Sequence, residues 1–489
     1  MTSNSAVPIS FYLLAGRIIL GLGQLLMIRV LTSVLDSAEI GKYYLLMSVV
    51  SGFSLFLINP ITVYIQRHLY GWNNQGVARI AIRKLLILLV LVGIGTSVIL
   101  YILNNLSLID LKVSIAVLVL IIPLLIAINS LTGLFPTLCN LLGKYQAFVL
   151  LSNLDLWGKI GFICLFAFFS PHLVGTVLGA IVFWGCLFAM MSGSYLYHCL
   201  EKPRDEKNLF NSRMAKDIFL FSWPLTLVVG LYWGQSEGYR FILQNTAGVN
   251  IVGNFVVAYS LGAALVIAID TLFHQLYMPT FYKEIANETP ESYRTAWNKY
   301  SKKLVGVCIP VGLYIACSGP FFAHWLVNVR YWDLGLYAAF GALSELFRIF
   351  SSCFYFGIIA QKNTSVLILP GILGTITALT GTWVLSYEFP ILGTGISLIL
   401  SHLIVSIGLY LKLKHTIDVQ IPWKRIGEAI LLSLPICILM LIAHTLGWDA
   451  VPILNLIALS LTGLGMLYIQ WKLSKDVWFQ RASETVKTN

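Results

Sequence analysis

The sequence predicts an all-α polytopic membrane protein with about fourteen transmembrane helices. Three observations predict it. Hydrophobic residues make up 58% of the 489 residues and charged residues only 11%, and the mean hydropathy is +0.83. A spanning helix needs about 20 mainly apolar residues, and many such stretches occur. The third observation is the uneven distribution of basic residues between the connections.

The expected spans follow one another with short polar connections, so no soluble domain is expected. Their boundaries come from where each apolar run begins and ends. They are 10–34, 40–66, 83–104, 113–137, 145–169, 173–198, 217–242, 250–277, 303–326, 332–360, 363–386, 391–411, 426–446 and 451–472.

Basic residues test this topology. With a cytoplasmic N-terminus, the inside connections and the C-terminal tail hold 24 Lys and Arg, and the outside loops hold three. Basic residues concentrate in cytoplasmic loops, so the sequence predicts that both termini lie in the cytoplasm; the resemblance described below implies the cell inner (plasma) membrane. The net charge of +11 then indicates anchoring against anionic membrane lipid, and no nucleic-acid partner is expected.

Several classes of chemistry are not expected. The start lacks the basic region of a cleavable signal peptide, and the first apolar run is a retained helix. The eight cysteines are scattered singly, without a C-x-x-C pair, so neither disulfides nor a metal site are expected. No Walker A, Gly-rich nucleotide loop or H-E-x-x-H motif occurs. We therefore predict no enzyme activity, no cofactor and no ATPase on this chain.

An internal repeat indicates the organisation. Arg29 is followed after eleven residues by Gly41-Lys42-Tyr43, and Arg240 after twelve residues by Gly253-Asn254-Phe255. Repeated membrane halves are common in alternating-access transporters, with the substrate site where the repeats meet. The predicted parts are an N-lobe of six helices (1–200), a cytoplasmic linker (201–216), a C-lobe of six helices (217–414), and two further helices with a tail (415–489).

Nine ionisable residues stand out within the membrane-spanning sequence. A charge within the bilayer is costly, so each is by default a candidate for function. The bases are Arg17, Arg29, Lys159, Arg240 and Arg348, and the acids are Asp155, Glu237, Asp270 and Glu345.

Six of the nine form pairs at helical spacing: Asp155 with Lys159, Glu237 with Arg240, and Glu345 with Arg348. Residues three or four apart share a helix face, so each pair can neutralise itself and simply lower the cost of insertion. The functional interpretation is that charges from both lobes face one aqueous cavity.

Arg17 has no acid three or four residues away on its helix, so its partner must come from elsewhere, and an anionic ligand is one candidate. Arg also suits bidentate phosphate recognition. Arg29 and Arg240 could instead snorkel to the interface. Asp270 and His274 could form a proton relay, or they could be a pair at the membrane interface without a functional role.

The chain resembles the polysaccharide transporters of the multidrug/oligosaccharidyl-lipid/polysaccharide (MOP) exporter superfamily, the Wzx-type repeat-unit flippases. The resemblance is carried by Arg29 and Gly41-Lys42-Tyr43, their repeat, and the segment from Leu276-Tyr277-Met278-Pro279 through Lys302-Lys303 to Pro310. With the fourteen-helix plan, it covers almost the whole chain.

The resemblance implies two six-helix bundles around a cationic cavity. It implies export of undecaprenyl-pyrophosphate-linked oligosaccharide, coupled to an ion gradient, for surface polysaccharide such as O-antigen of lipopolysaccharide. Arg17 lies in a Gly16-Arg17-Ile18-Ile19 context similar to the cavity arginine of lipid II flippases. Those flippases follow it with an Arg-Asp pair where this chain has Gly23-Gln24, which counts against lipid II as substrate.

We therefore expect a repeat-unit flippase. Arg17, Lys159 and Arg348 would bind the pyrophosphate, with Arg240 at the outer gate. Asp155, Glu345, Glu237 and Asp270 would couple transport to H⁺ or Na⁺. The expected partners are the polyprenyl-linked oligosaccharide, membrane lipid and a polysaccharide polymerase or co-polymerase. The alternatives are an ion-coupled multidrug (MATE-like) antiporter, a lipid II flippase, and a non-transporting scaffold of a polysaccharide synthase complex.

Overall fold

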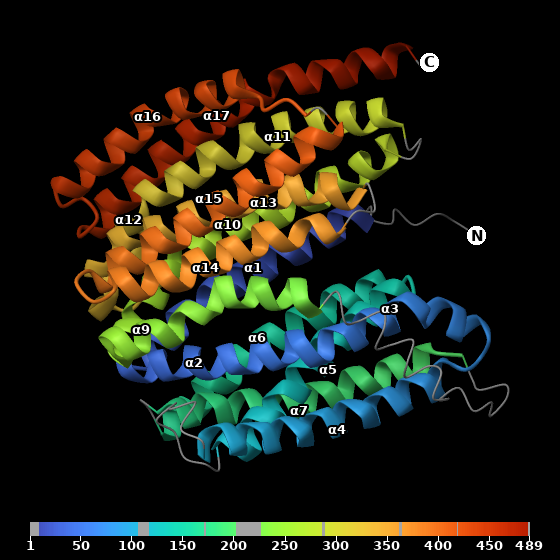
Figure 1. Ribbon diagram of the computed structural model, residues 1–489. Helices are drawn as coiled ribbons and strands as arrows, with labels where there is room; N and C mark the ends of the chain where they lie inside the picture. Colours follow the sequence, from blue (N-terminus) through green and yellow to red (C-terminus); the bar gives the residue numbers. More distant parts are fainter. Residues whose placement is uncertain are drawn as a thin grey trace, which may run out of the picture. The chain divides into compact units, whose positions relative to one another are not determined.

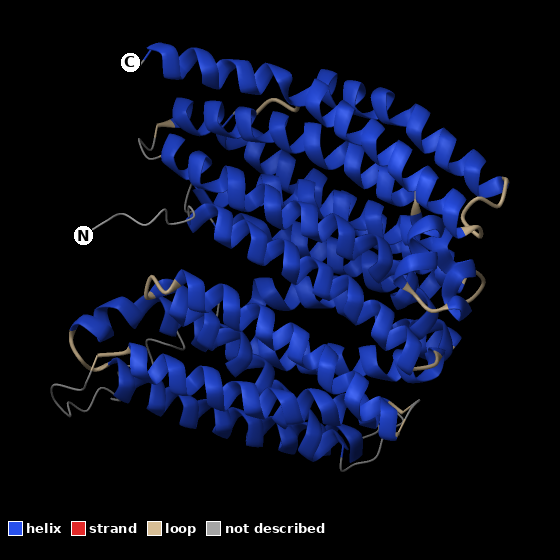
Figure 2. Cartoon of the chain, turned by 180° about the vertical axis from the view of Figure 1, so that it is seen from behind, coloured by secondary structure: helices blue, strands red, loops and turns tan. Residues whose placement is uncertain are grey.

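A computed structural model describes residues 9–105, 117–170, 173–201, 226–285, 289–360, 364–417 and 419–487. Most of the chain in these ranges is helical, short turns and loops connect the helices, and no strand occurs in them (Figures 1 and 2). The prediction of an all-α protein is thus confirmed over the described part of the chain.

The chain divides into two compact units, Met1–Phe241 and Ile242–Asn489. The helices of the first unit are α1 (Ile9–Val34), α2 (Ser37–Phe53), the π-helix η1 (Ser54–Ile58), α3 (Asn59–Asn74), α4 (Ala78–Asn105), η2 (Val117–Ile121), α5 (Ile122–Leu141), α6 (Tyr145–Phe169), α7 (Val174–Cys199) and η3 (Gly234–Gly238).

The second unit begins within α9 (Tyr239–Ala247). Its further helices are α10 (Val249–Glu284), α11 (Pro290–Cys317), α12 (Gly319–Leu326), η4 (Val329–Tyr337), α13 (Ala338–Ala360), η5 (Thr364–Leu367), α14 (Ile368–Leu385), α15 (Pro390–Ile417), α16 (Trp423–Thr445) and α17 (Pro452–Lys487).

Twelve helices in the described ranges are long and apolar enough to cross a membrane. Each overlaps one of the predicted spans. The other two predicted spans are 83–104, where the described apolar stretch is the shorter Leu91–Ile102, and 217–242, which begins in residues outside the described ranges. The chain is a multi-pass membrane protein, while the count of about fourteen stays a prediction.

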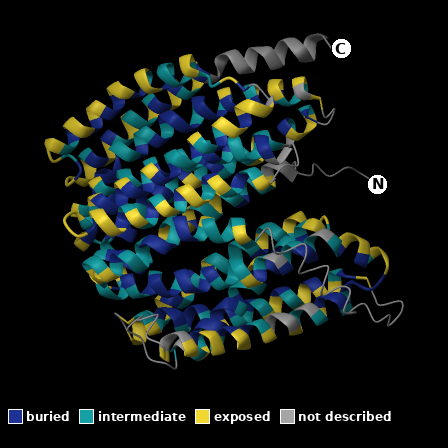
Figure 3. Cartoon of the chain, viewed as in Figure 1, coloured by how far each residue is buried: buried dark blue, intermediate teal, exposed yellow. Residues whose placement is uncertain are grey.

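The apolar surface fits this conclusion. Large hydrophobic side chains of α16 are exposed over much of its length, among them Leu431, Leu434 and Ile438 (Figure 3). Contiguous exposed apolar surface marks an interaction site, such as a membrane-facing surface, so these side chains are expected to face lipid.

Residues 226–241, which follow the predicted linker, belong to the first unit. Trp233 explains part of this: its indole Nε1 donates to the Ser48 carbonyl of α2 at 2.9 Å. Gly230 lies against the ring of Phe56. The linker itself lies largely outside the described ranges, and the two six-helix lobes stay a prediction.

Glycine brings α10 and α13 into backbone contact in the second unit. A Cβ on Gly341 would lie 1.9 Å from the Tyr259 carbonyl oxygen, and one on Gly262 would lie 2.0 Å from that of Ala338. Small residues allow such close approach of membrane helices. The contact sets the register that places Glu345, one turn beyond Gly341, beside α10.

Candidate functional site: charges within the helices

The second unit contains a buried cluster of charges on α10 and α13. Arg348 Nη2 lies 3.0 Å from Asp270 Oδ2, and Arg348 Nε donates to Glu345 Oε2. Asp270 and Glu345 are buried, and 19% of the Arg348 side chain is exposed. One guanidinium thus joins two carboxylates from two helices.

Polar side chains extend the cluster in both directions. His274 Nε2 lies 3.0 Å from Asp270 Oδ1, and His274 Nδ1 shares a 2.8 Å hydrogen bond with the hydroxyl of Tyr300 on α11. On the other side, the Tyr259 hydroxyl donates to Ser344 Oγ at 3.1 Å and to Glu345 Oε1 at 3.3 Å. The result is a continuous polar path across three helices.

The charges of this cluster do not cancel when His274 is neutral. Two carboxylates face one guanidinium, and Asp270 Oδ1 is buried and lies 3.0 Å from His274 Nε2. An excess negative charge in a low-dielectric site is costly, so a bound proton or a cation would stabilise the cluster. Within the described ranges, no group of three or more His, Cys, Asp or Glu side chains is arranged to hold a metal ion.

In the first unit, Asp155 and Lys159 of α6 form the expected pair, with Nζ 2.8 Å from Oδ2. Each side chain is less than one-fifth exposed. Asp155 Oδ1 is buried and accepts no hydrogen bond. The pair neutralises itself in this structure but keeps one unused acceptor.

Arg17 lies where α1 packs on α6. Its neighbour Gly16 contacts Val149, and Asn153 Nδ2 donates to the Gly16 carbonyl at 3.1 Å. The guanidinium carbon of Arg17 lies 5.5 Å from the centroid of the Phe148 ring. Within the described part of the chain, no carboxylate lies within ion-pair distance of Arg17. The Arg17 side chain is half-buried in this position.

Arg240 follows the π-helix η3, which carries Glu237. Arg240 Nη1 donates to Glu237 Oε2 at 2.6 Å and to Ser48 Oγ of α2 at 2.7 Å, and its guanidinium lies 5.4 Å from the Tyr44 ring. Only 13% of its side chain is exposed. Contacts within the first unit, rather than snorkelling, therefore satisfy Arg240. The repeat-related Arg29 differs, since its Nη1 is buried without a hydrogen-bond partner.

The structure therefore brings the nine intramembrane residues into separate groups. Asp270, Glu345 and Arg348 meet in one cluster, and the pairs Asp155–Lys159 and Glu237–Arg240 form as their spacing predicts. Sequence reasoning missed the cross-helix pair of Asp270 with Arg348 and the roles of Tyr259, Tyr300 and Ser48. The available signal was Gly341, one turn before Glu345, which marks the close helix contact.

The fold is similar to that of several solved transporters, among them members of the MOP superfamily. Neither a scan of protein-family models nor a search of curated proteins gives a match. The chain is similar to the lipid II flippase MurJ in an inward closed conformation, with a TM-score of 0.69 and 13% identity over 96% of this chain and 99% of that one.

Two other transporters share the fold. An inward-facing multidrug resistance MATE family transporter of the MOP superfamily gives a TM-score of 0.63 at 14% identity, over 86% of this chain and 96% of that one. A MOP superfamily transporter from Pyrococcus furiosus gives 0.55 at 13% identity, over 82% and 95% of the two chains. All three are transporters or flippases.

Proposed function

We propose that this protein is a flippase of the inner (plasma) membrane that moves undecaprenyl-pyrophosphate-linked oligosaccharide repeat units to the periplasmic leaflet. The observation that supports a transport function is the fold, which is similar to that of a lipid flippase over 96% of the chain. The product would be a surface polysaccharide such as O-antigen or exopolysaccharide. The Wzx-like motifs of the sequence support this substrate class.

Arg17 is the first ligand that we assign to the pyrophosphate. It is half-buried within a span and has no carboxylate partner in the described ranges, so its charge is available. A guanidinium binds phosphate oxygens bidentately, and such charge-assisted hydrogen bonds are strong in a site shielded from water. Lys159 lies further along the helix that packs against α1, and it would be the second ligand once released from Asp155.

Arg348 links substrate binding to the coupling ion. Asp270 and Glu345 hold the guanidinium while they are ionised. Protonation of these carboxylates would remove their charge and release Arg348 to an anionic substrate. Two ligands that act on one group in this way must be coupled reciprocally. The cluster thus supports coupling of transport to H⁺. The alternative is coupling to Na⁺, which would bind at the same carboxylates.

The pairs of the first unit would serve the same cycle. Asp155 would exchange Lys159 for a proton or cation in the same manner. Glu237 and Arg240 would form the outer gate, since their contact with Ser48 ties η3 to α2 and would have to break for opening.

Lipid II is a less favoured substrate. The similar flippase MurJ acts on it, but this chain has Gly23 where lipid II flippases carry an arginine. A Cβ at Gly23 would lie 2.8 Å from Leu156 and 3.2 Å from Trp157 of α6. A long basic side chain at this position would require Leu156 and Trp157 to move.

A multidrug antiporter is the second candidate, because a MATE family transporter shares the fold. Cationic drugs favour an acidic cavity, whereas bases outnumber acids by five to four among the nine intramembrane residues singled out above. Arg17, a cation without a carboxylate partner among the described residues, also favours an anionic substrate.

The deciding experiment is deletion of the gene in its native host, scored for surface polysaccharide and for lipid-linked repeat units in the cytoplasmic leaflet. Loss of the polymer with accumulation of those units is the expected result. Unchanged polysaccharide together with new sensitivity to cationic drugs would instead establish the antiporter. A polymerase or co-polymerase partner is tested by co-purification with the tagged chain.

A further inference from the structure

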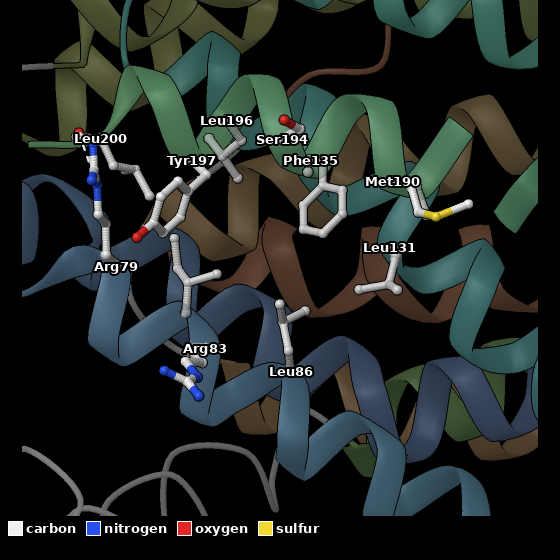
Figure 4. A pocket seen from close by; sticks show the side chains of 13 residues that line it. Arg79, Arg83, Leu86, Leu131, Phe135, Met190, Ser194, Leu196, Tyr197 and Leu200 are labelled. Carbon is white, nitrogen blue, oxygen red and sulfur yellow. Dashed lines mark hydrogen bonds between the residues drawn. The ribbon is translucent and has the colours of Figure 1, made fainter. Parts of the chain in front are cut away.

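The first unit contains a cavity of about 430 Å³ between α4, α5 and α7, and none of the nine intramembrane residues described above is among its described lining residues (Figure 4). This volume lies in the range of about 300–1,000 Å³ that is typical of ligand pockets. Arg79 and Arg83 lie at one end, and Leu86, Leu131, Phe135 and Met190 line the other.

Arg79 fixes the polar end of this cavity. Its Nη2 donates to the Leu200 carbonyl at 2.7 Å, and its guanidinium lies 4.3 Å from the Tyr197 ring. These contacts tie the start of α4 to the end of α7. Arg79 is therefore a positioning residue that shapes the mouth rather than a free cation.

Arg83, one turn further along α4, is exposed and makes no ion pair within the described ranges. Among the described residues that line the cavity, none is Asp or Glu. The end of the cavity formed by Arg79 and Arg83 is therefore positively charged. This charge complements an anionic group of a ligand. Because both arginines belong to a connection predicted to be cytoplasmic, this group would come from the inner leaflet.

The apolar end suits a hydrocarbon chain. Along α7, the lining runs from Leu200 to Ala189, which is about 16 Å at 1.5 Å per residue. One leaflet of the hydrocarbon core is about 15 Å deep, half of the core's thickness of about 30 Å. Met190 is 63% exposed and Tyr197 53%, so the cavity opens sideways on the surface of a candidate span.

We propose that this cavity binds one anionic phospholipid of the cytoplasmic leaflet, with its phosphate on Arg83 and one acyl chain along Leu86, Leu131 and Met190. The bound lipid would hold α4 against α5 and α7. The stability of the first unit would then depend on the anionic lipid content of the membrane. This site is separate from the proposed transport site and does not depend on which substrate is transported.

The test is native mass spectrometry of the full-length protein in detergent, titrated with phosphatidylglycerol. The wild type should retain one tightly bound lipid. Arg83→Ala should weaken retention about five-fold, the loss expected for one basic side chain at an anionic surface. Leu131→Trp should fill the apolar end and also reduce retention. Lys144→Ala, an exposed residue of another connection in the same unit, is the matched control and should retain the lipid.

Three results would overturn the proposal. One is equal retention by Arg83→Ala and Lys144→Ala, which indicates non-specific lipid contact. Another is equal retention of phosphatidylcholine, which removes the role of the headgroup charge. The third is displacement of the lipid by inorganic phosphate alone, which indicates an anion site without an acyl chain. Because Arg83 is exposed, Arg83→Ala should fold even where Leu131→Trp does not.

Discussion

Asp270 on α10 and Arg348 on α13, 78 positions apart in the chain, form a buried ion pair with Oδ2 and Nη2 3.0 Å apart. Glu345 contacts the same guanidinium. Because a single cation lies between two carboxylates, the net charge of this cluster depends on how many protons the carboxylates carry.

Arg348→Ala should destabilise the protein strongly, because it leaves two buried carboxylates without a cation. Breaking a buried pair in this way costs about 3–5 kcal/mol. The measurement is thermal unfolding of the purified protein in detergent. Adding Asp270→Asn and Glu345→Gln to Arg348→Ala should restore most of the lost stability, since no uncompensated charge remains. An Arg348→Ala protein as stable as the wild type would show that the pair is not buried.

The same cluster should give transport its pH dependence. If protonation releases Arg348, substrate binding takes up protons, so the affinity for the pyrophosphate-linked substrate should rise as the pH falls. Asp270→Asn with Glu345→Gln should bind substrate at all pH values and lose this dependence. Binding is measured in proteoliposomes over a pH series, with and without Na⁺.

The other titratable and charged groups near the cluster define the control for this experiment. Among the described residues they include His274, Tyr300, Tyr259, Cys308, Cys353 and His402. His274→Gln tests whether the imidazole contributes, and it should shift the profile without removing it. A wild-type affinity that follows Na⁺ concentration but not pH would contradict proton coupling.

Arg17→Ala should abolish export of repeat units while the protein remains folded and inserted. The reason is that Arg17 is a half-buried cation without a carboxylate partner in the described ranges, so its removal leaves no buried acid unpaired. Arg17→Lys should retain partial export, because lysine keeps the charge but not the bidentate geometry. Complementation of the deletion strain measures export, and Lys144→Ala controls for the loss of one positive charge. Normal export by well-expressed Arg17→Ala would refute the assignment.

Gly341→Ala should separate α10 from α13. Its Cβ would lie 1.9 Å from the Tyr259 carbonyl oxygen, which belongs to the backbone and cannot rotate away. Overpacking of this kind costs about 1–3 kcal/mol. Gly179→Ala in α7 is the matched control, because its Cβ meets nothing within 4 Å and alanine favours the helix. The midpoint temperature of thermal unfolding should be lower than that of the wild type for Gly341→Ala. For Gly179→Ala it should be unchanged or higher.

The sequence by itself determined the class of the protein and most of its helices. The apolar runs marked twelve helices that are long enough to span a membrane, because the length of a span and its hydrophobicity are local properties. Spacing also predicted the pairs Asp155–Lys159, Glu237–Arg240 and Glu345–Arg348, since residues three or four apart share a helix face.

Only the tertiary structure decided which of these charges meet across helices. The contact of Asp270 with Arg348 depends on the close approach of α10 and α13 at Gly262 and Gly341. The anchoring of Arg240 on Ser48 depends in the same way on how η3 packs against α2. Helical periodicity fixes the face on which a side chain lies, but the partner helix and its register come from packing between distant segments, which no local pattern encodes.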